Sequence, residues 1–150
     1  MLTCKLSNTH EDFCALTNAL DAELNVRYGK EQALYDQHNL IDPIETTLVG
    51  YEDDLPVACG CFKKIDDTTV EIKRMFVSPK YRRRGFSSQI LGALEAWVAE
   101  LGFSEARLET GKGQPEAIAL YAKMGYAVIP NYEPYVGMEN SVCMSKTVRK

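Results

Sequence analysis

Residues 70–88 read Val70-Glu71-Ile72-Lys73-Arg74-Met75-Phe76-Val77-Ser78-Pro79-Lys80-Tyr81-Arg82-Arg83-Arg84-Gly85-Phe86-Ser87-Ser88. The β-branched and aromatic residues at the start of this stretch predict a strand. Apolar residues at helical spacing follow its end and predict a helix. Between the two lies a short turn that contains three arginines and a glycine. The stretch therefore predicts the first part of a strand–helix–strand unit.

The first turn of that helix can hold an anion. It has free N–H groups and lies at the positive end of the helix dipole. Gly85 has no side chain to block a close approach, while Ser87 and Ser88 can add hydroxyl donors. A solvated basic turn before an ordinary amphipathic helix fits the same residues equally well. The P-loop and the dinucleotide fingerprint are excluded, because their glycine and lysine spacings are absent.

Strand and helix patterns alternate on both sides of this stretch. The expected strands are Leu2–Leu6, Thr46–Tyr51, Pro56–Lys63, Thr68–Val77, Ala106–Glu109, Tyr126–Ile129 and Ser141–Thr147. The expected helices are one with the stripe Phe13, Leu16, Leu20 and Leu24, capped by Ser7, Asn8 or Thr9, then Lys30–His38, a helix from Gly85 or Phe86 to Leu101, and Gln114–Met124. Short turns predict an antiparallel meander of the middle strands. The strand–helix–strand unit around Phe86–Leu101 predicts a right-handed parallel crossover. The expected class is α/β or α+β, with one domain over residues 1–150.

Composition narrows the class of protein. The chain has 150 residues, 45% of them hydrophobic, and a formal net charge of -4 with a pI near 5.2. This acidic balance argues against nucleic-acid binding. Because no apolar run or signal peptide is evident, we expect a cytoplasmic protein without membrane contact. Five dispersed cysteines and two distant histidines predict reduced thiols and no metal site.

Several motifs in order resemble the GNAT superfamily of acetyltransferases. Arg82–Ser87 resembles its Gln/Arg-x-x-Gly-x-Gly/Ala loop, with Ser87 in the last position. Residues 71–79 and Leu108–Gly111 look like its fourth and fifth strands. Residues 114–126 are similar to its Asn-x-x-Ala-x-x-x-Tyr-x-x-x-Gly-Phe segment, with Gln and Tyr at its ends. The resemblance is strong from about Val70 to Tyr126.

This resemblance implies a fold and a co-substrate. The fold is a central mixed, mostly antiparallel sheet flanked by helices, with the fourth and fifth strands splayed apart. The co-substrate is acetyl-CoA, whose pantetheine arm bonds to the main chain of Met75 and Val77. Its pyrophosphate is expected on the amides of residues 83–88. The full expected set is Met75, Phe76, Val77, Arg82, Arg83, Arg84, Gly85, Phe86, Ser87, Ser88, Gln114 and Ala117.

Two residues are candidates for catalysis. Tyr121 matches the family's tyrosine on the helix after the fifth strand, where a phenol can hydrogen-bond or protonate the leaving thiolate. A core tyrosine on a helix face is the alternative. In some family members a glutamate on the fourth strand acts as base, directly or through water, which makes Glu71 the second candidate. A strand glutamate paired with Lys73 or Arg74 is the alternative there.

The acceptor pocket is expected between the loop after the first helix and the last strands. Its candidate residues are Asn25, Tyr28, Tyr132 and Tyr135, of which two lie in an aromatic, proline-bearing loop of the kind that binds ligands. We expect a small-molecule primary amine to attack the thioester directly in a ternary complex. The alternative acceptor is a protein N-terminus or lysine. Two alternative functions also stay open, namely a non-catalytic acetyl-CoA-binding module and a polyanion binder. A homodimer is common in the resembling family.

Overall fold

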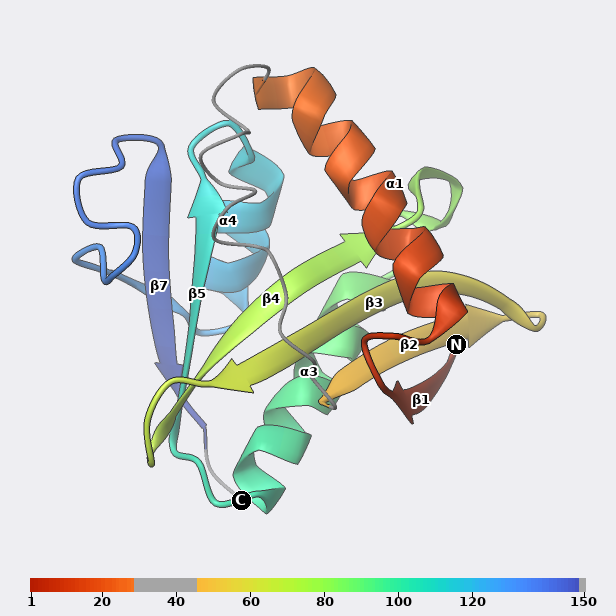
Figure 1. Cartoon of the computed structure of the whole chain (residues 1–150), viewed down its shortest axis with the longest axis horizontal. Coiled ribbons are helices and arrows are strands. Elements are labelled where there is room, and N and C mark those ends of the chain that lie inside the picture. The colour runs from red at the N-terminus through yellow and green to blue at the C-terminus, as the bar shows by residue number, and fades with distance from the viewer. Residues whose placement is uncertain (29–45, 149–150) are drawn as a thin grey trace.

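Within residues 1–28 and 46–148, which the computed structural model describes, seven strands form one mixed sheet (Figure 1). The strand order is β1-β2-β3-β4-β5-β7-β6. Neighbouring strands are antiparallel except β4 and β5, which are parallel. Their bounds are β1 Leu2–Leu6, β2 Thr47–Glu52, β3 Leu55–Lys64, β4 Thr69–Val77, β5 Glu105–Gly111, β6 Ala127–Ile129 and β7 Ser141–Thr147.

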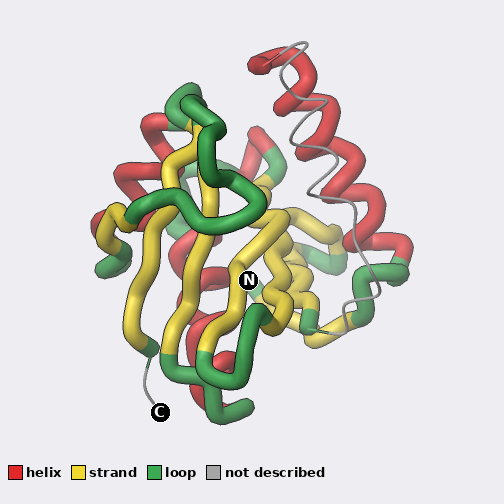
Figure 2. The backbone as a smooth tube through the Cα atoms, turned by 60° about the vertical axis from the view of Figure 1, so that its left-hand side comes forward, coloured by secondary structure: helices red, strands yellow, loops and turns green. Residues whose placement is uncertain are grey.

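Helices cover both faces of this sheet. They are α1 Glu11–Tyr28, the short 3-10 helix η2 Pro79–Tyr81, α3 Phe86–Glu100 and α4 Pro115–Lys123. Figure 2 shows α1 on one side of the strands and α3 and α4 on the opposite side. The core is divided in the same way, since α1 packs with one buried cluster while α3 and α4 contribute to the other.

Apolar periodicity explains why these helices form and where they pack. Ile90, Leu91, Leu94 and Val98 lie on one face of α3 and are fully buried against the sheet. Burying each such side chain is worth about 1.5–3 kcal/mol. On the opposite face of the sheet, the predicted stripe of α1 packs in the same manner, with Phe13 and Leu16 buried. The two helices therefore fix the middle strands between them.

The predicted elements are confirmed wherever the structure describes them, with small changes at their ends. β1 and β7 have the predicted bounds, and the helix predicted over Gln114–Met124 is one residue shorter at each end. The N-terminus of α1 differs, because the amide of Asp12 donates to Nδ1 of His10 at 3.1 Å. An imidazole thus accepts where a Ser, Asn or Thr cap was predicted. The predicted helix Lys30–His38 lies outside the described residues.

The separation of β4 from β5 is the feature that creates the site. The parallel ladder runs from Thr69↔Glu105 to Ile72↔Leu108 and then ends, although both strands continue (Figure 1). A bulge follows at once on β4, where Arg74 has a φ of 60° and the register with β3 shifts. The splayed strands and the parallel crossover are both confirmed, and the strands diverge toward α1 and α4.

Candidate active site

Two adjoining cavities lie where β4 and β5 separate. The larger has a volume of about 500 Å³ and follows β4 to the start of α3. The smaller has a volume of about 100 Å³ and lies over the end of the parallel ladder. Side chains from α1, from β4 and from α4 with its N-cap line both cavities. The two spaces therefore meet at these residues: Leu20, Leu24, Met75, Gln114 and Tyr121.

The larger cavity ends at the N-terminus of α3. Gly85 precedes the helix with a φ of 79°, a conformation that residues with a side chain rarely adopt. The open first turn of α3 thus faces the cavity. All but one of the predicted cofactor-binding residues line it: Met75, Phe76, Val77, Arg82, Arg83, Gly85, Phe86, Ser87, Ser88, Gln114 and Ala117. Arg84 lies outside the lining, with its guanidinium 5.4 Å from the ring centre of Tyr81.

Arg82 joins the arginine loop to α1 across the rim of the larger cavity. Its Nε donates to the carbonyl of Val77 at 2.9 Å. Its two terminal nitrogens donate to both carboxylate oxygens of Glu23, at 2.7 and 3.2 Å. Bidentate pairs of this kind fix geometry as well as charge. Arg82 therefore holds the loop in place, and the Val77 carbonyl already accepts a hydrogen bond within the protein.

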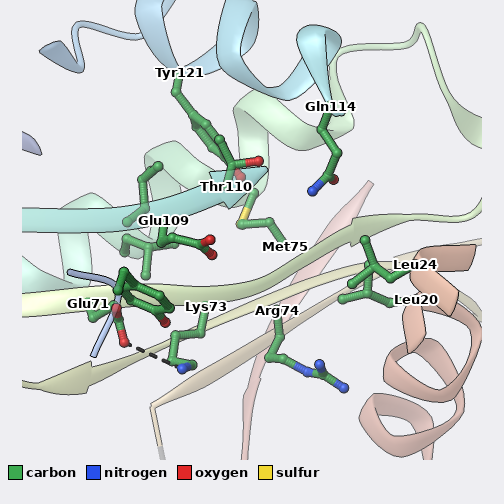
Figure 3. A pocket seen from close by; sticks show the side chains of 13 residues that line it. Leu20, Leu24, Glu71, Lys73, Arg74, Met75, Glu109, Thr110, Gln114 and Tyr121 are labelled. Atoms are coloured by element: carbon green, nitrogen blue, oxygen red, sulfur yellow. Dashed lines mark ion pairs between the residues drawn. The ribbon is translucent and has the colours of Figure 1, made fainter. Parts of the chain in front are cut away.

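Glu71 lines the smaller cavity and is held there by two partners, of which Figure 3 shows Lys73. Its side chain is buried, and Nζ of Lys73 lies 3.4 Å from Oε1. The hydroxyl of Tyr132 donates to Oε2 at 2.8 Å. Both alternatives raised by the sequence are thus present, since Glu71 lines a cavity at the splay and is also paired with Lys73. The ion pair and the hydrogen bond together anchor both carboxylate oxygens of Glu71.

A second carboxylate, Glu109 on β5, points into the same cavity (Figure 3). Burial raises the pKa of this carboxyl to about 7, with the negative charge of Glu71 acting in the same direction. The hydroxyl of Ser141 donates to Oε2 at 2.7 Å and limits the rise. The carboxyl therefore changes charge close to neutral pH.

Tyr121 reaches the junction of the cavities from α4. The side chain is buried, and burial raises the pKa of the phenol to about 12, with the nearby charge of Glu109 adding to the rise. Its ring packs edge-on against the ring of Tyr126, with centres 6.0 Å apart. The phenol thus stays protonated at neutral pH and is available as a hydrogen-bond donor.

Arg74 connects the β4 bulge to α1 beside the smaller cavity. Its terminal nitrogens lie 2.8 and 2.9 Å from the two oxygens of Asp21. Only 7% of the Arg74 side chain is exposed, so the pair is shielded from water on one side. The pair fixes the middle of α1 against the bulge, and Leu20 and Leu24 then face the junction.

The predicted acceptor residues separate into two groups. Tyr135 lines the smaller cavity, and Tyr132 reaches it through the bond to Glu71. Their rings meet edge-on with centres 5.6 Å apart, and burial raises the pKa of both phenols. Asn25 is exposed on α1 and lies outside the lining of either cavity, while Tyr28 is the last residue of α1.

Sequence reasoning missed Glu109, Lys73 and Thr110 as lining residues. Glu109 alternates with buried Leu108 and Thr110 on a short strand, and this pattern fits any half-exposed strand. The one available signal is its place just before the strand ends, where the fourth and fifth strands were already expected to splay. The Ser141 contact spans 32 residues and has no sequence signature.

Comparisons with known proteins agree with this geometry. The sequence profile described as Acetyltransferase (GNAT) family matches residues 13–126. The chain belongs to this family. It is an acetyl-CoA-dependent N-acetyltransferase. An IAA acetyltransferase of Azospirillum brasilense is 33% identical over 133 residues, which cover 87% of each chain.

Solved structures support the same fold. A putative acyl-CoA N-acyltransferase from Klebsiella pneumoniae has a TM-score of 0.82 at 27% identity, covering 98% of this chain and 97% of that one. The PaiA N-acetyltransferase of Thermoplasma acidophilum, solved with coenzyme A, has a TM-score of 0.69 at 18% identity, covering 97% and 98%. At this identity, the similarity to the PaiA N-acetyltransferase shows a shared fold alone.

Two further observations concern the described part of the chain. No helix within residues 1–28 and 46–148 is long and apolar enough to cross a bilayer. All five cysteines are free thiols, and Cys59 and Cys61 are buried beside Gly60. Gly60 allows a close contact with Met75, because a Cβ at this position would lie 2.6 Å from Sδ of Met75.

Proposed function

We propose that the chain transfers the acetyl group of acetyl-CoA to the primary amine of a small molecule, by direct attack in a ternary complex. The observation that carries this proposal is the meeting of two different cavities at Tyr121 and Met75. One follows β4 to a helix N-terminus, and the other is small and contains two carboxylates.

The larger cavity suits acetyl-CoA in shape and chemistry. Open main-chain N–H groups at the start of α3, with Ser87 and Ser88 in its first turn, suit a pyrophosphate. Arg83 adds positive charge to the lining, while Phe76 and Leu120 supply apolar surface for the pantetheine arm. When bound, acetyl-CoA supplies a thioester carbonyl that an amine can attack.

In the overall reaction a nitrogen–carbon bond forms and the carbon–sulfur bond breaks. The products are the acetylated amine, the CoA thiol and one proton. Tyr121 is the proposed donor to the sulfur, because its phenol keeps its proton at neutral pH and lies at the junction. The proton released by the acceptor needs a base, and Glu71 remains the candidate that the sequence predicts. Such positioned acids and bases contribute about 100- to 10,000-fold each.

The smaller cavity supports a compact, cationic acceptor group. A volume of about 100 Å³ admits the amine end of a molecule and little more. Glu71 and Glu109 face this space, and carboxylates attract an ammonium. We also propose a cytosolic location, which the five free thiols support. A homodimer stays a prediction from the family.

Calorimetric titration with acetyl-CoA tests the cofactor site. We expect wild-type affinity in the roughly micromolar range, and its loss in Gly85→Glu, which places a negative side chain at the anion-binding turn. Arg84→Ala is the matched control, because Arg84 neighbours Gly85 but lies outside the cavity lining. Absence of binding by the folded wild-type protein would refute the proposal.

Acceptor screening tests the transfer itself. The probes are tyramine, spermidine, an amino-acid amide and a tetrapeptide with a free N-terminus. Turnover is followed by the ultraviolet absorbance of the thioester, since the protein's own thiols would react with a thiol reagent. Acetylation of a small amine supports the proposal, whereas selective acetylation of the tetrapeptide would indicate a protein acceptor. Binding of acetyl-CoA without any turnover would indicate a non-catalytic module.

A further inference from the structure

The two carboxylates of the smaller cavity differ in how their oxygens are used. Both oxygens of Glu71 have partners, one from Lys73 and one from Tyr132. Glu109 has one anchored oxygen, Oε2, which accepts from Ser141 at 2.7 Å. Oε1 of Glu109 has no hydrogen-bond partner among residues 1–28 and 46–148, and the side chain points into the cavity (Figure 3).

We propose that Glu109 is the general base that takes the proton from the acceptor ammonium, and that Glu71 is a positioning residue. The inference rests on the proposed function, because it assigns a role within that reaction. Glu71 holds Tyr132 and Lys73 at the cavity wall and adds negative charge. Glu109 receives the proton because one of its oxygens is fixed while the other faces the space for the acceptor.

The proton transfer is balanced within the site. An N–H bond of the ammonium breaks, an O–H bond forms at Oε1 of Glu109, and the nitrogen keeps its lone pair for attack. The carboxylate becomes neutral in this step. After the acetylated product leaves, Glu109 returns the proton to solvent, which accounts for the one proton released in each turnover.

The electrostatic setting of Glu109 suits this exchange. A base works best when its pKa lies near the working pH, because it must accept a proton and release it again. Burial and the charge of Glu71 raise the pKa of Glu109 to about 7, and the charge of Lys73 opposes the rise. Within the described part of the chain, the titratable and charged groups that interact with this carboxyl are Glu71 and Lys73 on β4, Cys143 on β7, Tyr121 on α4 and Tyr135 on the loop between β6 and β7.

Glu109 also lies near Tyr121. Glu109 comes from β5 and Tyr121 from α4, and the charge of Glu109 acts on the phenol. Both side chains line the smaller cavity, which opens where the parallel ladder ends. A proton acceptor and a proton donor with pKa values of about 7 and about 12 thus share one small space. Such a pair is the usual mark of base and acid roles.

The pH dependence of kcat/KM separates Glu109 from Glu71. The assay uses whichever probe of the acceptor screen is acetylated, with wild type, Glu109→Gln and Glu71→Gln. We expect an acidic limb near pH 7 in the wild type. In Glu109→Gln the rate should fall at least about 100-fold and the limb should disappear. In Glu71→Gln the limb should remain and move to lower pH, because a negative neighbour has been removed.

The opposite pattern would overturn the inference. If Glu109→Gln keeps the limb and the rate while Glu71→Gln loses them, Glu71 is the base and the proposed function still stands. Calorimetry with acetyl-CoA shows that each variant retains the folded cofactor site. If the wild type binds acetyl-CoA but acetylates none of the probes, the proposed function fails first, and the inference fails with it.

A second measurement does not depend on the acceptor. The carboxyl carbons of isotope-labelled glutamate are titrated by NMR, and the Glu109 signal is identified by its absence in Glu109→Gln. We expect its midpoint near pH 7 and a downward shift in Glu71→Gln. A midpoint below about 5, the ordinary range of a glutamate, would overturn the inference whatever the enzyme acetylates.

Discussion

The substitution Glu109→Gln should make the protein more stable above neutral pH. The pKa of this carboxyl is raised from 4.5 to about 7 in the folded chain. Between these values the folded state keeps a proton that the unfolded chain has released. The stabilising contribution is therefore complete below pH 4.5 and is lost as the pH rises to about 7. The amide introduced by the substitution carries no charge at any pH and can still accept a hydrogen bond from Ser141.

The size of the effect follows from the same shift. A rise from 4.5 to about 7 corresponds to about 3 kcal/mol, at about 1.36 kcal/mol for each pH unit. Because the side chain is only partly shielded from water, we expect about 2 kcal/mol. The variant should thus exceed the wild type in free energy of unfolding by about this amount above pH 7 and match it near pH 4.5.

Urea unfolding followed by circular dichroism, at several pH values across this window, measures the difference. Glu139→Gln is the matched control, since Glu139 is exposed and its replacement should change stability little at any pH. A constant difference between Glu109→Gln and wild type across the window would refute the reasoning. So would a variant that becomes less stable as the pH rises, because the carboxylate would then be favoured by the fold.

Three further changes test other parts of the site. Tyr121→Phe should lower turnover about 100-fold and leave the affinity for acetyl-CoA unchanged by calorimetry; an unchanged rate would exclude the donor role. Arg74→Ala should lower the free energy of unfolding by about 2–3 kcal/mol, since it leaves Asp21 without its bidentate partner; a loss within the error of urea unfolding would contradict this. Gly60→Ala should lower the free energy of unfolding by about 1–3 kcal/mol and displace Met75, whose Sδ would lie 2.6 Å from the added Cβ. Thermal unfolding measures the loss of stability, and the KM for acetyl-CoA measures the displacement of Met75. An unchanged KM would mean that Met75 moves away from the cavities.

Local pattern was sufficient for most of the fold. The strands Leu2–Leu6 and Ser141–Thr147 were predicted with their observed bounds, because alternation and flanking polar residues define them. The predicted turn after β2 forms at Asp53 and Asp54, which both have a positive φ. The cap of α1 was mispredicted, since propensity favours Ser, Thr, Asn and Asp and takes no account of an imidazole that can accept a hydrogen bond.

The site was predictable only where a motif carries it. The loop around Gly85 and the position of Tyr121 follow from the family resemblance, and the structure places both on the larger cavity. The different roles proposed for Glu71 and Glu109 depend on their hydrogen bonds from Tyr132 and Ser141, which span 61 and 32 residues. Which carboxylate oxygens are already bonded within the protein is a property of the folded chain, and sequence spacing does not encode it.

The early end of the ladder between β4 and β5 has a consequence for the dynamics of the whole enzyme. Past Ile72 and Leu108, the edges of the two strands face a cavity and lack each other as hydrogen-bonding partners. A co-substrate that lies along β4 would hydrogen-bond to this unpaired edge, as an added strand does. Slowed hydrogen exchange should then spread from β4 into β5 and β7, and melting should become cooperative across both halves of the sheet. Before binding, only the four residue pairs from Thr69 to Ile72 join β4 to β5 within the described sheet.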